Sequence, residues 1–350
     1  MRISKDKKDV TVSSIAKDLG LSASTVSFVL TGQAKKHHIS TQTANLVKNH
    51  AKSVGYVPNF WARGLKKNKS NIISAYFADV GYWSNDIIRG ISQALKNKGY
   101  TFMLNVNWGE PQVLEDELKE AISRRDEGVI IHPILVNHDY SYFIKHKIPT
   151  VFVSDIQEDF RNLKNISLVE WNVTPAIELV VNRFRNTGKN KVGFIGSHYG
   201  MVSDMIRFQA YKAAAEKAKL IMEEEWVVWL PYPITYSAPD FDDSLIKEHI
   251  EKILLNKNRP EAMFILNDFL AVKILSIISE TEINIPNDIS IISVGDLMIA
   301  EHVGLTTLVE PRELLGQVTG ETLLNIIEGQ ESPNCKKKVE FSELKIRNTG

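Results

Sequence analysis

From Asn71 onward, short apolar runs rich in β-branched and aromatic residues alternate with segments of helical period. Such alternation predicts parallel sheets that helices cover on both faces. It occurs in two series, which predict an α/β domain of two lobes, each a doubly wound parallel sheet. The first series comprises Ile72–Ala78, Asp86–Lys98, Tyr100–Val106, Val113–Arg125, Gly128–His132, Tyr140–His146 and Pro149–Val153, and the second comprises Pro175–Arg185, Lys191–Ile195, Asp204–Ala218, Trp226–Leu230, Asp243–Leu255, Ala262–Leu266, Leu270–Ser279 and Ile289–Val294.

The N-terminal region has a different pattern, which predicts a helix-turn-helix over residues 11–30. Apolar residues from Val12 to Leu19 recur at helical spacing, and Gly20 can adopt the positive φ of a helix C-cap. Ser22 can cap the start of a second helix. In that helix Ser24 and Phe28 point away from Val26, so hydroxyls and an aromatic ring face outward, where the DNA major groove would lie.

A third helix is expected to start at the Ser40 cap and to close a small all-α core with Ala44, Val47, Ala51 and Val54. The loop before it contains Lys35 and Lys36. These lysines either reach phosphates or belong to a plain solvated loop, and the sequence leaves both open.

Charge is distributed unevenly along a chain whose total charge is zero. Residues 1–70 hold thirteen Lys and Arg against three Asp, a net charge of +10, and the remaining 280 residues carry −10. A basic N-terminal segment on an acidic body is typical of a nucleic-acid-binding head.

The N-terminal motifs resemble those of the lactose-repressor (LacI/GalR) family of bacterial transcription regulators. The matching residues are Val10-Thr11, Ala16, Gly20-Leu21-Ser22, Thr25-Val26-Ser27 and Val29-Leu30-Thr31-Gly32. Further along, Gly55-Tyr56-Val57-Pro58-Asn59 and Ala62-Arg63-Gly64-Leu65 look like the hinge of that family. Later motifs fall at matching distances, so the resemblance covers nearly the whole chain.

The resemblance implies three regions: a DNA-binding head at 1–57, a hinge helix or linker at 58–70, and an effector-binding and dimerisation domain at 71–350. By likeness to periplasmic-binding-protein-like domains, one lobe takes about 71–168 and 297–328, and the other about 169–296 and 329–350. The chain would thus return near Leu297 and cross again near Glu328. The last strand, expected over Lys338–Ile346, is followed by no heptad pattern, which favours a dimer over a tetramer.

For DNA, the resemblance implies base contacts from the recognition helix and minor-groove contacts from the hinge. Phe28 stands where the family has a base-reading arginine; it cannot pair with guanine but can press on a thymine methyl. Leu65 would wedge into the central minor groove. The expected contacts are Ala23, Ser24, Ser27 and Phe28 to bases, Thr11 and Thr25 to phosphates, and Asn59, Ala62, Leu65 and Lys66 from the hinge.

For the effector, the segment Arg207-Phe208-Gln209-Ala210-Tyr211 matches a family motif whose arginine binds the ligand through its planar fork of donors. Asn267 matches a second motif, in which Asp268 would only cap a helix. The other expected contacts are Tyr82, Trp83, Trp171, Tyr232 and Asp296. Tyr82 and Trp83 could equally be core aromatics. Gly295 stands where the family has an acid that often accepts sugar hydroxyls, which counts against a typical sugar effector.

Several classes of protein and site are disfavoured. The single cysteine, Cys335, excludes internal disulfides, and neither a signal-peptide pattern nor a long apolar stretch occurs. The glycines of Gly193-Phe194-Ile195-Gly196 are wrongly spaced for a dinucleotide site, and His132, His138 and His146 match no zinc motif. We therefore expect a cytoplasmic protein with no catalytic residues, no metal and no cofactor.

Together these features predict a homodimeric repressor that binds a pseudo-palindromic double-stranded operator. A small polar effector, expected to be a carbohydrate, would bind between the lobes as either inducer or co-repressor. Two alternatives remain: a solute-binding protein without a DNA role, and a sugar-processing enzyme on the same scaffold.

Overall fold

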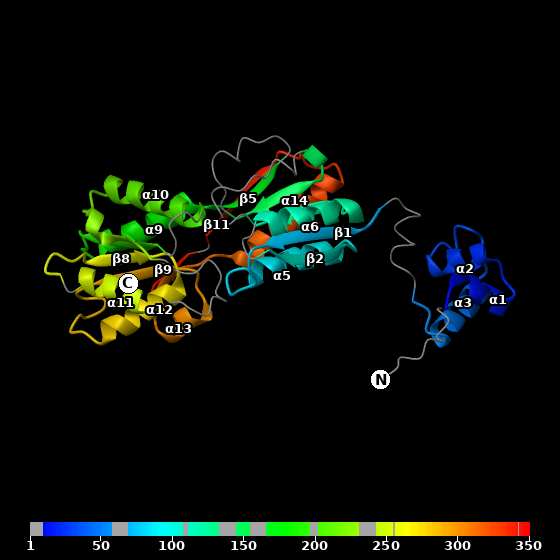
Figure 1. Ribbon diagram of the computed structural model, residues 1–350, viewed down its shortest axis with the longest axis horizontal. Helices are drawn as coiled ribbons and strands as arrows, with labels where there is room; N and C mark the ends of the chain where they lie inside the picture. Colours follow the sequence, from blue (N-terminus) through cyan, green and yellow to red (C-terminus); the bar gives the residue numbers. More distant parts are fainter. Residues whose placement is uncertain are drawn as a thin grey trace. The chain divides into compact units, whose positions relative to one another are not determined.

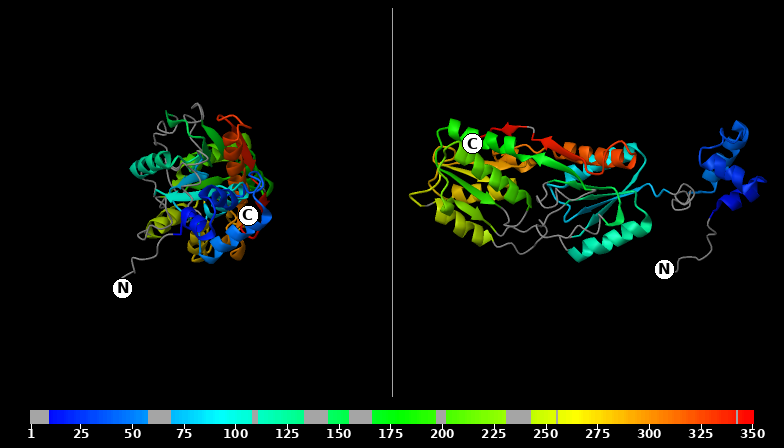
Figure 2. Two further views of the ribbon diagram at one scale, coloured as in Figure 1. Left: turned by 90° about the vertical axis from the view of Figure 1, so that its right-hand side faces the viewer. Right: turned by 90° about the horizontal axis from the view of Figure 1, so that it is seen from above.

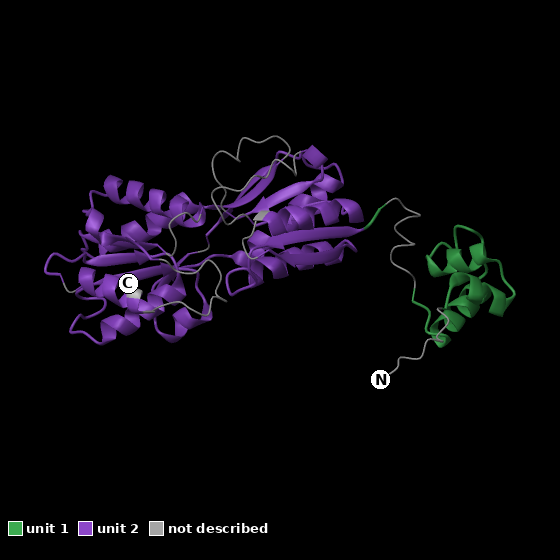
Figure 3. Cartoon of the chain, viewed as in Figure 1, with its two compact units in different colours: residues 1–70 green, residues 71–350 purple. Residues whose placement is uncertain are grey.

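The computed structural model describes residues 10–57, 69–107, 111–132, 145–154, 166–196, 202–230, 243–254, 256–341 and 343–350. The chain divides into two compact units (Figure 3), a first unit of residues 1–70 and a second unit of residues 71–350. The hinge predicted at 58–70 falls almost entirely outside the described residues, and so does most of the helix predicted at Tyr140–His146.

The first unit contains three helices, α1 (Val12–Leu19), α2 (Ala23–Leu30) and α3 (Thr41–Ser53). The predicted caps are confirmed: Gly20 has φ 63°, and the hydroxyls of Ser22 and Ser40 accept hydrogen bonds from the backbone N–H groups of Thr25 and Thr43. These contacts satisfy N–H groups that the first helical turn leaves without partners.

The core of the first unit is small and made of residues from all three helices. Its buried members are Ile15, Ala16, Val26, Val29, Ala44, Val47 and Ala51. They are the residues that helical spacing placed on the inner faces, except that Val54 lies at the margin of the cluster. The predicted helical N-terminal region is confirmed.

The second unit contains two six-stranded sheets within the described residues (Figure 1). The first sheet has the order β11-β5-β4-β3-β1-β2, and all of its pairings are parallel. Its strands are β1 (Ile72–Phe77), β2 (Thr101–Val106), β3 (Gly128–Ile131), β4 (Thr150–Val153), β5 (Ser167–Asn172) and β11 (Lys336–Glu340), and its helices are α5 (Asn85–Asn97), α6 (Pro111–Arg124) and α14 (Arg312–Ile327).

Helices cover both faces of this first sheet. In β1, Ile73, Ala75 and Phe77 belong to the cluster that includes α5 and α14, whereas Tyr76 packs with α6. Figure 2 shows α14 and α6 on opposite sides of the strands. Helices α5 and α14 cross closely at Gly316, where an added Cβ would lie 2.0 Å from the carbonyl oxygen of Ile87.

The second sheet has the order β12-β10-β9-β8-β6-β7 and is parallel except for the edge strand β12. Its two faces also pack into separate clusters, one with α9 and α10 and one with α11 to α13. Its strands are β6 (Val192–Gly196), β7 (Val227–Trp229), β8 (Ala262–Ile265), β9 (Ser290–Val294), β10 (Thr306–Leu308) and β12 (Leu344–Lys345), and its helices are α9 (Val173–Asn186), α10 (Val202–Lys217), the 3-10 turn η1 (Glu224–Trp226), α11 (Asp243–Leu254), α12 (Asp268–Ser279) and α13 (Met298–His302). The predicted two-lobed α/β fold is confirmed.

The lobe boundaries differ from those predicted. Strand β5 stays in the first sheet as far as Asn172, because its ladder with β11 runs to that residue. The return expected near Leu297 is wrong, since α13 and β10 still belong to the second sheet and α14 is the first element back at the first sheet. The single strand predicted over Lys338–Ile346 is instead two strands, β11 and β12, in different sheets.

Candidate functional site

The outward side of α2 carries small, uncharged side chains. Ala23 and Ser24 are exposed and Ser27 is half-exposed. The hydroxyl of Thr25 lies 2.8 Å from that of the capping residue Ser22. At the start of α1, the exposed Thr11 caps the helix by accepting a 3.1 Å hydrogen bond from the N–H of Ser14. Because its side chains are small, the outward side of α2 allows another molecule to approach the helix closely, and it offers hydroxyl groups for hydrogen bonding.

Phe28 is not the bare outward ring that the sequence predicts. It is half-buried, and the ring of His37 stacks on it with centroids 3.5 Å apart and planes 10° apart. His37 belongs to the loop between α2 and α3. The prediction missed this contact because it assigned the loop no fixed conformation.

Five predicted contact residues lie outside the described residues: Asn59, Ala62, Leu65 and Lys66 of the hinge, and Tyr232 of the second unit.

Arg207, the strongest effector candidate, is part of a buried charge cluster in the second unit. It lies on α10 and pairs with Glu310, with 2.6 Å between its Nη2 and Oε1. The other carboxylate oxygen of Glu310 accepts hydrogen bonds from Arg312 at 2.8 and 3.0 Å. All three side chains are at most 10% exposed. The two guanidinium groups hold the pKa of Glu310 below its usual range although burial alone would raise it.

Trp171 and Arg207 both contact the ring of Phe341, so Trp171 lies close to the charge cluster. The guanidinium of Arg207 lies 5.9 Å from the ring centre of Phe341, and the ring of Trp171 lies 5.2 Å from it. Trp171 is 4% exposed, so it is chiefly a packed residue. Phe341 and Glu310 both lie in segments that connect the two sheets, so Arg207 joins two of these connections.

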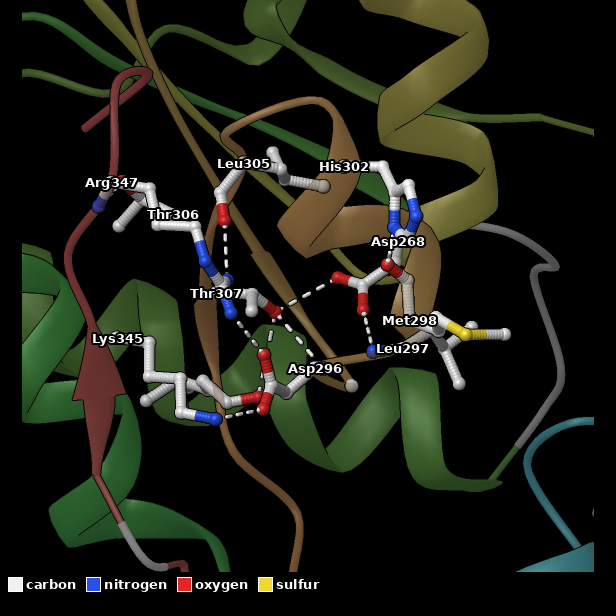
Figure 4. Close-up of polar contacts among 12 residues, drawn as sticks. Asp268, Asp296, Leu297, Met298, His302, Leu305, Thr306, Thr307, Lys345 and Arg347 are labelled. Atoms are coloured by element: carbon white, nitrogen blue, oxygen red, sulfur yellow. Dashed lines mark hydrogen bonds and ion pairs between the residues drawn. The ribbon is translucent and has the colours of Figure 1, made fainter.

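The residue that caps α12 is Asn267 and not Asp268, which the sequence had assigned to the cap. Asn267 caps α12 through its side-chain oxygen, which accepts from the N–H groups of Phe269 and Leu270 at 2.8 and 3.2 Å. Asp268 is 1% exposed and accepts a hydrogen bond from the hydroxyl of Ser293. It also accepts from the hydroxyl of Thr307 and the N–H of Leu297 (Figure 4). Burial raises the pKa of Asp268 despite these bonds.

Gly295, which replaces an expected acid, fits closely against charged groups. Its φ is 138°, and an added Cβ would lie 2.9 Å from both Arg312 Nη2 and Asp268 Oδ2. Its carbonyl oxygen accepts from Arg312 at 2.7 Å. A larger residue here would displace the Arg312 guanidinium. The position of the Arg312–Glu310 pair therefore depends on glycine at 295.

Asp296 faces cations supplied by the C-terminal segment. It pairs with Lys345 at 2.5 Å and with Arg347 at 2.7 Å, as Figure 4 shows. These cations lower the pKa of Asp296. Its carboxylate is therefore engaged within the second lobe.

The aromatic residues after β1 point to different neighbours. Tyr82 is 61% exposed, and its ring lies 4.9 Å from that of Phe269 on α12, which makes a contact between the two lobes. Trp83 packs 4.4 Å from His132 at the end of β3. His132 is half-buried as a residue, but its Nδ1 is covered and has no hydrogen-bond partner. Burial lowers the pKa of His132 to about 3, so the ring is neutral near pH 7.

Of the predicted effector residues, the structure brings Arg207 and Trp171 together around Phe341, and Tyr82 near the α12 start that Asn267 caps. Glu310, Arg312 and Phe341 were missed, although an acid two residues after a buried strand is a signal at Glu310. Across the described ranges, no three His, Cys, Asp or Glu side chains are grouped so as to hold a metal ion. None of the helices in those ranges combines the length and apolar character needed to cross a membrane.

Comparison with known proteins gives matches along most of the chain. Residues 181–349 match the model of a periplasmic binding protein-like domain. The ribose operon repressor of Escherichia coli K12 is 24% identical over 321 residues, which cover 91% of this chain and 93% of the repressor. The transcriptional repressor PurR of Vibrio cholerae is 24% identical, with 92% of each chain covered.

Solved structures agree in fold. The lac repressor dimer bound to operator and the anti-inducer ONPF matches with a TM-score of 0.81 at 20% identity, covering 98% of this chain and 99% of that one. The complex of the regulator CelR with cellobiose matches with a TM-score of 0.68 at 20% identity, covering 97% and 100%. The domain match and the two repressors that align over nine-tenths of its length support the resemblance of this chain to regulators of the LacI/GalR family.

Proposed function

We propose that this protein is a transcriptional repressor that binds a pseudo-palindromic DNA operator and responds to a small polar effector. The observation that carries the proposal is the similarity to repressors over about nine-tenths of the chain, joined to a capped helix-turn-helix whose second helix exposes Ala23 and Ser24. The basic charge of residues 1–70 supports the same partner.

In this proposal the head reads DNA through α2. Ala23, Ser24, Ser27 and Phe28 meet base edges in the major groove, while Thr11 and Thr25 meet phosphates. From the hinge, Asn59, Ala62, Leu65 and Lys66 meet the DNA, with Leu65 in the minor groove. One helix-turn-helix reads half a site, so the protein acts as a homodimer with two-fold symmetry. It acts in the cytoplasm and is not an enzyme.

The effector binds between the lobes of the second unit. We assign its contacts to Tyr82, Trp83, Trp171, Arg207, Tyr232, Asn267 and Asp296, and its class to carbohydrates, because the similar regulator CelR was solved with cellobiose and another relative is a ribose operon repressor. Arg207 contributes its guanidinium, whose planar fork of N–H donors suits bidentate hydrogen bonds to a polar ligand. An effector that favours the hinge-disordered form releases DNA, and one that favours the ordered form strengthens binding.

The test is selection of bound duplexes from a random pool by the purified protein, with Ser24→Glu and Ser123→Glu as matched variants. Both serines are exposed, but Ser123 lies on α6 of the second unit. We expect the wild type and Ser123→Glu to enrich one palindrome and Ser24→Glu to enrich none, because its carboxylate would enter a major groove whose flanking phosphates repel a negative charge. Equal enrichment by both variants would remove α2 from the proposal.

The effector part is tested separately by thermal shift of the purified protein with a panel of sugars. A sugar that raises the melting temperature of the wild type and not of Arg207→Lys would support the assignment, since lysine cannot reproduce the planar fork. A sugar that stabilises both equally would place Arg207 outside the effector site.

A further inference from the structure

The loop between α2 and α3, residues 31–40, has a fixed conformation. Backbone hydrogen bonds run from Gln33 N to Phe28 O at 2.8 Å, from His37 N to Gln33 O at 3.1 Å and from Ile39 N to Ala34 O at 2.9 Å. Gly32 and His38 adopt positive φ angles of 75° and 51°, which reverse the chain. The loop therefore folds back onto the end of α2.

This fold brings the His37 ring onto the Phe28 ring. The centroids are 3.5 Å apart and the planes are nearly parallel, at 10°. The two residues differ in burial, since Phe28 is half-buried and His37 is exposed. The Phe28 ring thus lies beneath the exposed imidazole of His37 and fixes the plane of that imidazole.

The chemistry of the two rings is complementary. Helix α2 has the sequence Ala-Ser-Thr-Val-Ser-Phe-Val-Leu, so it carries no charged side chain and no amide. Phe28 can offer only apolar contact, whereas an imidazole has one nitrogen that donates and one that accepts when neutral. His37 is therefore the side chain that brings ring-nitrogen hydrogen bonding to the surface around Phe28.

We propose that His37 is a base-reading residue: its imidazole, held on Phe28, hydrogen-bonds to the edge of a base in the major groove beside the base that Phe28 contacts. This inference rests on the proposed DNA-binding function. The reading surface is then made by two segments, with hydroxyls and an apolar ring from α2 and the hydrogen-bonding ring from the loop.

A purely structural role for the stack would leave a different signature. If His37 only packs the loop against α2, then phenylalanine, which keeps a flat ring, should serve equally well. The matched pair is therefore His37→Phe, which keeps the stack and removes the ring nitrogens, and His38→Phe, which makes the same change at the next exposed position. His37→Asn restores a donor and an acceptor without the full ring.

The experiment uses the full chain. The wild type first selects duplexes from a random pool, and each variant is then measured against the selected duplex and all single-base changes of its half-site, at two salt concentrations. Melting temperature is recorded in parallel.

We expect His37→Phe to keep the melting temperature and to lose about tenfold in preference at one half-site position, the scale of one lost hydrogen bond to a base. We expect His38→Phe to keep the preference at every position and His37→Asn to recover part of it. Preferences of His37→Phe that match the wild type would overturn the inference. So would an equal loss on all sequences with a shallower salt dependence, which marks a phosphate contact.

If the wild type enriches no sequence, the proposed function fails and this inference falls with it. Enrichment by the wild type with unchanged preferences in His37→Phe leaves the proposed function standing and removes His37 alone. The two failures are thereby distinguished.

Discussion

The second unit contains two buried carboxylates, those of Glu310 and Asp268, which are stabilised by different kinds of hydrogen-bond donor. Glu310 is held by two guanidinium groups, those of Arg207 and Arg312. Asp268 is held by two hydroxyls and one backbone N–H. Both are almost completely shielded from water, and burial by itself raises the pKa of each.

The outcome differs because Glu310 pairs directly with two guanidinium groups, whereas the Arg312 charge is the smallest of the influences on Asp268. The pKa of Glu310 is lowered, whereas the pKa of Asp268 remains raised despite three hydrogen bonds. Formal charge at close range outweighs the desolvation of a carboxylate, and neutral donors do not. Glu310 therefore serves as a charged link between α10 and the start of α14, and Asp268 as an acceptor that organises the end of β9.

The largest effect is expected from removing the charged link. Glu310→Ala should lower the free energy of unfolding of the second unit by about 3–5 kcal/mol, because it leaves two buried guanidinium groups without their carboxylate. Chemical denaturation followed by circular dichroism would measure this. The exposed Glu301 gives a matched control, and Glu301→Ala should change stability by less than about 0.5 kcal/mol. Equal effects of the two changes would contradict the role of Glu310.

Comparison of the wild type with Glu310→Gln measures how the stability that Glu310 contributes depends on pH. A carboxyl whose pKa is lowered on folding contributes stability above its unfolded value, about 4.3 for glutamate, and loses it as pH falls through the folded value. The stability difference between wild type and Glu310→Gln should thus be constant near neutral pH and shrink below about pH 4. A difference that grows on acidification would contradict the assigned direction.

A smaller effect is expected at Gly295, which lies against Asp268 and the Arg312 guanidinium that pairs with Glu310. Gly295→Ala should cost about 2–3 kcal/mol, because φ 138° is strained for alanine and the new Cβ would meet Arg312 Nη2 and Asp268 Oδ2 at 2.9 Å. The control is Gly329→Ala, where φ is also positive at 74° but no atom lies within 4 Å of the new Cβ. The excess loss at Gly295 over Gly329 measures the crowding, and no excess would show that Arg312 moves aside freely.

Sequence reasoning succeeded where the determinants lie close together in the chain. The caps at Ser22 and Ser40 and the C-cap at Gly20 depend on neighbours three to five residues away, and each is confirmed. The alternation of strands and helices likewise predicted the two-lobed fold, because burial on both faces of a parallel strand requires an apolar run.

It failed where partners come from distant segments. Strand β5 continues to Asn172 only because β11, 168 positions later, pairs with it, and periodicity contains no such information. Glu310 was missed because its partner Arg207 is 103 positions away. The side chains of Asn267 and Asp268 can both cap a helix. Asp268 is the one that is buried, because the hydroxyls of Ser293 and Thr307, from distant strands, donate to its carboxylate.

Asp268 itself should give a third, intermediate effect. Asp268→Asn should cost about 1–2 kcal/mol, because the amide relieves the desolvated charge but replaces one of two acceptor oxygens with a donor. A carboxyl whose pKa is raised on folding opposes stability when ionised, so the wild type should gain stability relative to Asp268→Asn as pH falls through the folded pKa. This is the opposite direction to Glu310, and parallel pH profiles for the two variants would refute the distinction.

The smallest effect is expected at Asp296, which has two cations but less shielding. Its partner Lys345 has a side chain that is 42% exposed, so solvent screens the pair. Asp296→Asn should cost about 1 kcal/mol or less, and most of that difference should disappear in 1 M salt, where the Debye length is about 3 Å. Asparagine also tolerates the φ of 52° found here, so the backbone adds no separate penalty. If Asp296→Asn cost as much as Glu310→Ala, then the number of cationic partners, and not their burial, would set the strength of these links.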